Sequence, residues 1–302
     1  MDVPGEVRRT DGAKPHWSTA FAAPAVQLDR LVSSYGWFRE VSARPMVRQE
    51  LPTPKMILLI SLAGPLSLAR GITKRDSCRS AAALVGVGRE PVVAVHNGYQ
   101  SVLEVQLSPL SALELFGVSA SIVADDVIDL ADLWTGTTEF VERLTAATTW
   151  QQRIGLLDTT LTARITRGRR PDPALTAAWQ HLLDCGGDLD LSVLREQTGW
   201  SRRRLAERFR AQVGLPPKTM ARLMRFQRAV DLLRSPGHRS LAAIASTCGY
   251  CDQPHFNREF RELAGRTPTA FLAEMQADLP GTDMAAAAAA AQTSKTPDRA
   301  RF

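Results

Sequence analysis

The sequence predicts an α+β protein with two parts, a β-rich N-terminal domain followed by helices and an all-α C-terminal domain. Three observations support this prediction. Short apolar stretches alternate with turn residues up to Leu107, helical periodicity begins after Pro109, and the segment between Leu191 and Phe271 contains one helical pattern twice. With 302 residues, the chain is long enough for about two domains.

Four apolar stretches predict strands in the N-terminal part, at Lys55–Leu62, Ala82–Val87, Val92–Val95 and Val102–Leu107. In the last of them, apolar residues alternate with Glu104 and Gln106, which is typical of a half-buried strand. We expect a small barrel or sandwich.

Three helices are expected next, at Leu110–Phe116 with Gly117 as a stop, at Thr138–Ala146 and at Trp150–Ile165. The following segment is rich in Arg and Pro and predicts a linker. The predicted organisation is a flexible arm (1–16), a sensor or dimerisation domain (17–165), a linker (166–173), the duplicated region (174–275) and a disordered tail (276–302).

The duplicated region predicts two helix-turn-helix units. Each copy contains a short helix, a glycine turn, a second helix with an apolar stripe, and a Gly then Pro stop. The copies are offset by 50 residues up to Trp200 and Tyr250, and by 51 from Leu205 and Phe256 onward. The residues expected to form the cores of the units are Leu194, Gly199, Leu205, Phe209, Ile244, Ala245, Gly249, Phe256 and Phe260.

Polar residues stand where the four helices of the repeat should begin. Asp190 and Ser201 are the expected N-caps in the first copy, and Ser240 and Asp252 are those in the second. Pro254 fits the first turn of its helix.

The outer face of the last helix of the repeat suits DNA. Gln253, Asn257 and Arg258 are candidates for base contacts in a major groove, because Arg pairs with guanine and Asn or Gln with adenine. Arg261, one turn further on, is a candidate phosphate contact. The simpler interpretation of such a face is a solvated surface.

The equivalent face of the first copy holds Arg203 and Glu207 as candidate base contacts and Arg202 and Arg210 as candidate phosphate contacts. Arg203 and Glu207 are four residues apart, so they could instead pair with each other. Between the copies, Lys218–Arg234 predicts a long helix with Arg222, Arg225 and Arg228 exposed. Such a helix would let two recognition helices enter successive major grooves, roughly 34 Å apart.

Residues 174–273 resemble the AraC/XylS family of bacterial transcription regulators. The resemblance is carried by Arg225–Leu233, Ser240–Ala245, Gly249-Tyr250, Asp252, His255-Phe256, Arg258, Phe260-Arg261 and Gly265–Pro268. It implies a DNA-binding domain of two helix-turn-helix units joined by a linker helix, behind a domain that senses a ligand or mediates dimerisation. The N-terminal half resembles the degenerate cupin-like sensor domains of such proteins.

Two positions depart from the pattern of that family. Arg195 stands where the second copy has the small residue Ala245, so it could splay the first helix pair or extend outward. Ala206 lacks the polar reach common at its position. The first unit is therefore expected to add affinity more than specificity.

Charge supports a polyanionic partner. The net charge is +6, and residues 174–275 hold 15 basic against 10 acidic residues. No uninterrupted apolar run of about 18 residues is present, so no membrane segment is predicted.

Other candidate sites are weak. Cys248 and Cys251 form a CxxC sequence without a second metal-binding pair, so neither a zinc site nor a redox switch is favoured. His16 and His96 are too few for a cupin metal site, and Asp125, Asp126, Asp129 and Asp132 are better explained by helix capping. No cofactor is implied. No catalytic motif is present, and an enzyme is not expected.

The sequence as a whole predicts a cytoplasmic, nucleoid-associated transcription regulator that binds specific double-stranded DNA and is modulated by its N-terminal domain. A small-molecule effector, a second copy of the chain and RNA polymerase are the further partners considered. The alternative is an effector-binding or protein-interaction module with weak, non-selective DNA binding. The effector, the operator and the sign of regulation do not follow from the sequence.

Overall fold

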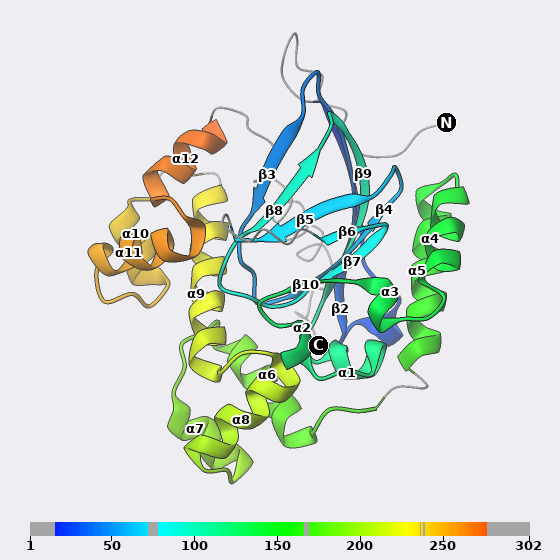
Figure 1. Cartoon of the computed structure of the whole chain (residues 1–302). Helices are drawn as coiled ribbons and strands as arrows, with labels where there is room; N and C mark the ends of the chain where they lie inside the picture. The colour runs from blue at the N-terminus through cyan, green and yellow to red at the C-terminus, as the bar shows by residue number, and fades with distance from the viewer. Residues whose placement is uncertain (1–15, 72–77, 166–168, 236, 238, 277–302) are drawn as a thin grey trace, which may run out of the picture.

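The computed structural model describes residues 16–71, 78–165, 169–235, 237 and 239–276 (Figure 1). The predicted flexible arm and disordered tail fall outside these residues except at their inner ends. His16 begins the first strand, and Gln276 ends the last helix.

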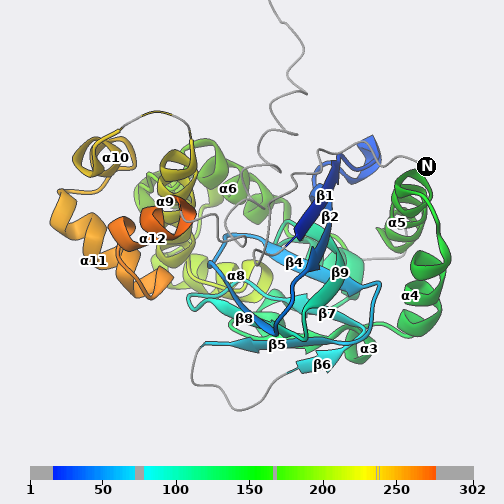
Figure 2. The same ribbon diagram turned by 90° about the horizontal axis from the view of Figure 1, so that it is seen from above.

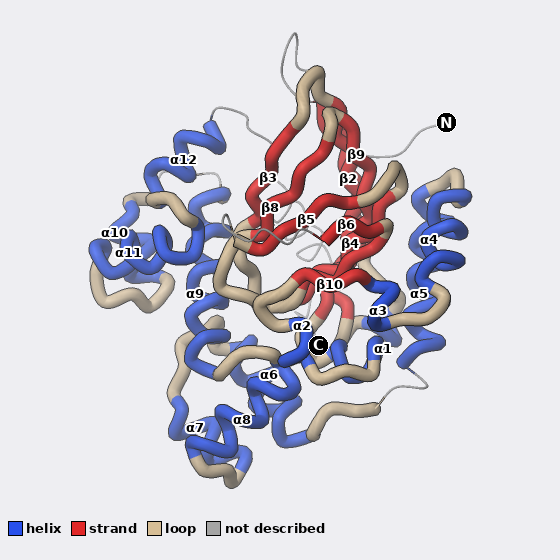
Figure 3. The backbone as a smooth tube through the Cα atoms, viewed as in Figure 1, coloured by secondary structure: helices blue, strands red, loops and turns tan. Residues whose placement is uncertain are grey.

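The N-terminal domain contains two sheets, in which every strand pair is antiparallel (Figure 3). The six-stranded sheet has the order β1 (His16–Ala22), β2 (Val32–Val41), β9 (Tyr99–Leu107), β4 (Met56–Ser61), β7 (Ala82–Val85) and β10 (Val127–Asp129). The four-stranded sheet has the order β3 (Met46–Glu50), β8 (Val92–His96), β5 (Leu66–Arg70) and β6 (Cys78–Ser80). The predicted β-rich domain is confirmed.

The prediction that Val102–Leu107 is a half-buried strand is wrong. In β9, Leu103, Val105 and Leu107 are buried in the main apolar core, and the alternating Glu104 and Gln106 are buried as well. The reason is that β9 is an inner strand, paired with β2 on one side and β4 on the other. The second face of the strand therefore points into the protein, where polar side chains need partners.

The helices of the first domain are η1 (Val26–Leu28), α1 (Ser111–Phe116), α2 (Ala120–Val123), α3 (Leu130–Leu133), α4 (Thr137–Ala146) and α5 (Trp150–Ile165). Three of them lie where the sequence predicts helices, and Gly117 ends α1 with a φ of 72°. Asp158 on α5 accepts hydrogen bonds from the Tyr35 hydroxyl at 2.8 Å and from the Ala25 amide at 2.9 Å. These bonds tie α5 to β2 and to the segment that leads into η1.

The C-terminal region is helical throughout its regular elements: α6 (Pro173–Asp184), α7 (Leu191–Thr198), α8 (Arg202–Val213), α9 (Pro217–Arg234), α10 (Leu241–Thr247), α11 (Gln253–Ala264) and α12 (Pro268–Gln276). Pro217 and Pro268 do more than end the preceding helices. Each is in the first turn of the next helix, where proline loses no hydrogen bond and its φ is already helical. Likewise α6 begins at Pro173, inside the predicted linker, and Asp172 caps it.

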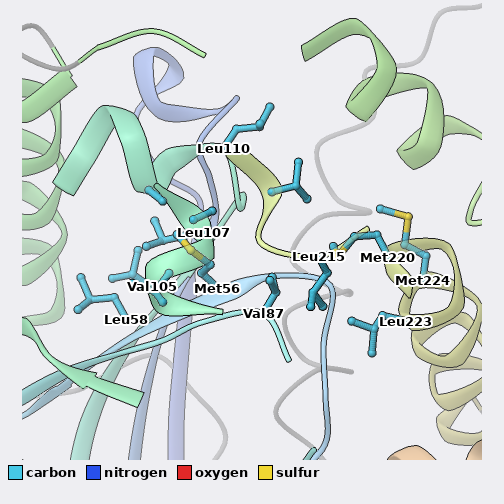
Figure 4. Packing of buried hydrophobic residues seen from close by; sticks show 14 of the residues in the cluster. Met56, Leu58, Val87, Val105, Leu107, Leu110, Leu215, Met220, Leu223 and Met224 are labelled. Carbon is cyan, nitrogen blue, oxygen red and sulfur yellow. The ribbon is translucent and has the colours of Figure 1, made fainter. Parts of the chain in front are cut away.

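The two parts of the molecule share one apolar core. Val87 lies at the junction with Leu215, and the buried side chains continue to Leu223 and Met224 on α9 (Figure 4). Helix α9 runs along one side of the β domain, whereas α4 and α5 lie on the opposite side (Figures 1 and 2).

Candidate nucleic-acid interface

The two copies of the repeat fold into two helix-turn-helix units, α7 with α8 and α10 with α11. All four predicted N-caps are confirmed, since each side chain accepts a backbone N–H of its helix. The pairs are Asp190 with Ser192, Ser201 with Arg204, Ser240 with Ala243 and Asp252 with His255. A cap of this kind stabilises a helix by about 1 kcal/mol.

The turns and the cores of the units also match the sequence. Gly199 and Gly249 have φ values of 66° and 76°, a backbone conformation that glycine adopts without strain. The apolar residues predicted to form the cores are buried, namely Leu194, Leu205, Phe209, Ile244, Ala245, Phe256 and Phe260. The local pattern of each copy therefore sets both its turn and its buried face.

The candidate contacts on α11 differ in exposure. Arg258 and Arg261 are exposed, whereas Gln253 and Asn257 are half-buried. The side-chain oxygen of Asn257 is enclosed and has no hydrogen-bond partner among the described residues. Arg258 is thus the base-contact candidate on this helix that is already accessible.

The candidate contacts on α8 are all exposed, namely Arg202, Arg203, Glu207 and Arg210. Arg203 and Glu207 form an ion pair with Nε and Oε1 2.8 Å apart. The structure therefore contains the alternative raised by their spacing, in which the two side chains pair with each other. A base edge would have to compete with that pair, which is exposed and therefore weak.

The sequence analysis missed Glu259, which is buried on α11 and faces α9. Its Oε2 lies 3.0 Å from Nε of Arg222 and 3.8 Å from Nη2 of Arg225.

The prediction that Arg222 and Arg225 are exposed is wrong, because both side chains turn toward the Glu259 carboxylate and are half-buried. Arg228 is exposed as predicted. Arg222 also pairs with the exposed Glu262. The signal in the sequence was an acidic residue beside Phe260, facing a helix rich in arginine.

Arg195 extends outward. It is exposed on α7, whereas Ala245 at the equivalent position of α10 is 1% exposed. The first helix pair accommodates the long side chain because its charged end reaches solvent.

The weaker candidates take structural roles. Cys248 is buried and Cys251 exposed, and both are free thiols. His96 pairs with Glu40, with Nε2 and Oε2 2.8 Å apart, and His16 lies in β1. Asp129 caps α3. Within the described ranges, no group of three or more His, Cys, Asp or Glu side chains could hold a metal ion.

A family model described as a helix-turn-helix domain matches residues 194–274. Residues 194–274 form an AraC-type helix-turn-helix domain. Helix-turn-helix domains bind DNA by placing the second helix of a unit in the major groove. The predicted α+β architecture, with a β-rich domain ahead of the helix-turn-helix region, is also confirmed.

Three solved structures illustrate the similarity. ToxT from Vibrio cholerae has a TM-score of 0.49 at 9% identity, over 85% of this chain and 97% of that one. The DNA-binding domain of AdpA, solved with a target DNA, has a TM-score of 0.32 at 27% identity, over 36% and 97%. A probable AraC family regulator from Rhodopseudomonas palustris has a TM-score of 0.31 at 25% identity, over 34% and 97%. No curated protein sequence matches the chain.

The N-terminal domain contacts both units of the helix-turn-helix domain. The Ser119 hydroxyl at the start of α2 donates to the Ala211 carbonyl of α8. Gln49 of β3 donates from Nε2 to the carbonyl of Ala264, the last residue of α11, at 3.1 Å. Both recognition helices are therefore held near their C-terminal ends by the β-rich domain.

No helix of the described residues has the length and the apolar character needed to cross a membrane.

Proposed function

We propose that this protein is a sequence-specific transcription regulator that binds two successive major grooves with α8 and α11. The observation that carries the proposal is the pair of capped helix-turn-helix units flanking one continuous helix, α9. With 18 residues, α9 is about 27 Å long. That length is comparable with the roughly 34 Å between successive major grooves on one face of DNA.

In this proposal, the two recognition helices have unequal roles. On α11, Arg258 contacts a base, Gln253 and Asn257 do so after local rearrangement, and Arg261 contacts phosphate. On α8, Arg202 and Arg210 contact phosphate, and Arg203 and Glu207 reach bases only if their ion pair opens. Helix α8 then contributes mainly affinity, and α11 contributes mainly specificity.

The proposal assigns a regulatory role to residues 17–165, a linker role to 166–173 and DNA binding to 174–275. It is supported by the hydrogen bonds that Ser119 and Gln49 make to the two recognition helices. A change in the β-rich domain would reach both helices through these contacts. The proposed role is binding and regulation rather than catalysis, in the cytoplasm with the chromosomal DNA. A small-molecule effector is the first partner proposed beside DNA, and a second copy of the chain and RNA polymerase are the others.

The test is selection of bound sequences from a random duplex pool with the full chain. We expect a bipartite site whose two parts are about one helical turn apart. We also expect the logarithm of the affinity to fall linearly with the logarithm of salt concentration. A pool that shows no enrichment while the protein still binds in a salt-dependent manner would favour the alternative, a module with weak and non-selective DNA binding. Binding that does not respond to salt would contradict both.

A further inference from the structure

A cavity of about 610 Å³ lies between the strands of the β-rich domain and helix α9. This volume falls in the range of small-molecule sites in proteins. Apolar side chains from both sheets form much of its wall, among them Ile57, Leu59, Leu68, Val92 and Val102. Met224 and Val230 add apolar surface from α9. The cavity can therefore hold an apolar body of moderate size.

Four carboxyl groups line this apolar cavity, and one of them is that of Glu90, between β7 and β8. Glu50 comes from the end of β3, Glu104 from the middle of β9 and Asp231 from α9. Glu104 accepts from Gln106 Nε2 at 2.9 Å, and Asp231 accepts from Gln227 Nε2 at 2.9 Å. Among the described residues, none donates a hydrogen bond to the carboxyl group of Glu50, which is half-buried. Its carboxyl group is an acceptor that the protein leaves open toward the cavity.

Three basic side chains of the wall already have partners. Lys55 donates from Nζ to Gln106 Oε1 at 2.8 Å, and the charges of Glu104 and Asp231 act on it. Arg70 donates to the carbonyls of Gly86 and Glu90. His96 is paired with Glu40.

Three further arginines line the cavity or act on Glu50. Arg228 and Arg234 of α9 line the cavity, and Arg234 together with Arg48 of β3 opposes the effect of Glu104 on Glu50. Burial and the nearby Glu104 raise the pKa of Glu50 to about 7, against the opposing charges of Arg234 and Arg48, so that a cation bound beside Glu50 would favour its ionised form.

We propose that this cavity binds a small amphipathic amine, with its ammonium group against Glu50 and its apolar body along β4, β5 and β9. The ammonium would donate a hydrogen bond to Glu50 and place a positive charge beside Glu50 and Glu104. A ligand carboxylate would instead add a like charge beside Glu50 and Glu104.

The site also suits regulation. Glu50 directly follows Gln49, which holds the end of α11, and α9 lines the opposite wall. A ligand in the cavity therefore contacts the same two elements that position the second recognition helix. This regulatory part of the inference rests on the proposed function as a DNA-binding regulator, whereas the binding of the amine does not.

The test is calorimetric titration of the full chain with octylamine, nonanoate and octanol. The three probes carry the same eight-carbon chain and differ in the charge of the head group. We expect octylamine to bind at least about tenfold more tightly than nonanoate, with octanol between them, because a hydrogen bond to a charged group contributes roughly 1.5–3 kcal/mol. We also expect octylamine to bind more tightly at about pH 8 than at about pH 6, where Glu50 is protonated.

The variant Glu50→Gln should weaken octylamine binding about tenfold or more and should leave nonanoate unchanged or improved. Glu142→Gln, which changes an exposed carboxylate on α4, is the matched control and should not alter either affinity. If Glu50→Gln fails to fold, Glu104→Gln offers a second test of the same negative charge. Equal binding of octylamine and nonanoate, or octylamine binding that is unaffected in Glu50→Gln, would overturn the proposal.

DNA binding is measured separately on the same samples. Salt-dependent binding of the selected duplex without octylamine tests the proposed function alone. Failure of that binding with octylamine binding intact would reject the DNA-binding proposal and keep the amine site. The reverse result would reject only the amine site.

Discussion

At the scale of single residues, neighbouring charges on α11 have different surroundings and different expected roles. Arg258 and Arg261 point into solvent, whereas Glu259 between them is buried against the arginines of α9. A helix places residues three apart on related faces and adjacent residues about 100° apart, which explains how one short segment contains both an outer and an inner charge. The outer charges are available to DNA, and the inner charge joins two helices.

Replacing Arg258 by Ala should relax base preference at one position of the operator. The expected loss is about 1–3 kcal/mol for the preferred sequence and little for others, because one side chain reaches a base edge. Arg261→Ala should weaken binding to all sequences alike and reduce the salt slope by about one. Fluorescence anisotropy with selected and scrambled duplexes measures both. Identical selected sites for wild type and Arg258→Ala would show that Arg258 does not contact a base.

Replacing Glu259 by Gln should destabilise the helix-turn-helix domain by about 2–3 kcal/mol, because two half-buried arginines lose their buried carboxylate partner. Glu262→Gln is the matched control, since Glu262 pairs with the same Arg222 from an exposed position and should cost under about 1 kcal/mol. Urea unfolding followed by circular dichroism measures the two effects. Equal shifts of the urea midpoint in the two variants would mean that the burial of Glu259 adds nothing to the stability its ion pairs provide.

At the scale of elements, the two helix-turn-helix units share the same caps and turns but differ in the side chain they accommodate where their helices cross. Both begin their helices at side-chain caps and turn at a glycine with positive φ. They differ at the crossing of their helices, where α10 buries Ala245 and α7 exposes Arg195. The long side chain is thus compatible with the first unit only because its position on α7 opens to solvent.

Exchanging the residue types at positions 195 and 245 should have unequal effects on the stability of the two units. Ala245→Arg should destabilise the second unit by about 3 kcal/mol or more, because a charge and a long side chain enter a fully packed crossing. Arg195→Ala should change stability by under about 0.5 kcal/mol, as expected for an exposed helical site. Thermal unfolding followed by circular dichroism measures both. A large loss of stability in Arg195→Ala would show that the arginine supports the first crossing.

At the scale of the whole molecule, one core and one cavity link the β-rich domain to the helix-turn-helix domain. The apolar packing runs from the sheets through Val87 to Leu215 and α9 (Figure 4). The polar groups that face the cavity come from segments as distant in sequence as Glu50, Glu104 and Asp231. Their ionisation therefore depends on the docking of the two parts.

The stability of the full chain should fall as pH rises from about 4.5 to above 7. The folded pKa of Glu50 is raised to about 7 from 4.5, mainly by burial and then by Glu104, against Arg234 and Arg48. The folded state therefore binds a proton that the unfolded state has released, and this stabilisation is complete below the unfolded pKa and lost as pH passes the folded one.

Glu50→Gln should reduce this pH dependence, to which Glu104 and Asp231 also contribute, and be more stable than wild type at about pH 8, by roughly 2–3 kcal/mol. Urea unfolding over this pH range measures the effect, with Glu142→Gln as the control that keeps the wild-type slope. Parallel pH profiles for wild type and Glu50→Gln would mean that another group governs the slope, and Glu104 and Asp231, whose pKa values burial also raises, are the first candidates.

The sequence alone determined the duplicated unit, because its information is local. Helix caps, glycine turns and the apolar stripe ending in Phe256 and Phe260 act within a few residues of each other, so the printed order of residues is enough to predict them. The same holds for Gly117 as the end of α1. The arginines on the outer faces of α8 and α11 also followed from helical spacing.

Only the tertiary structure decided what lies opposite each polar residue. Glu104 alternates with apolar residues as a solvent-facing residue would, yet it faces an internal cavity because β9 is an inner strand covered on both faces. Glu259 belongs to a polar stretch of α11, yet it is buried because α9 brings Arg222 to it. Periodicity fixes which side of an element a residue occupies, but segments distant in sequence decide whether that side meets solvent, a cavity or a partner charge.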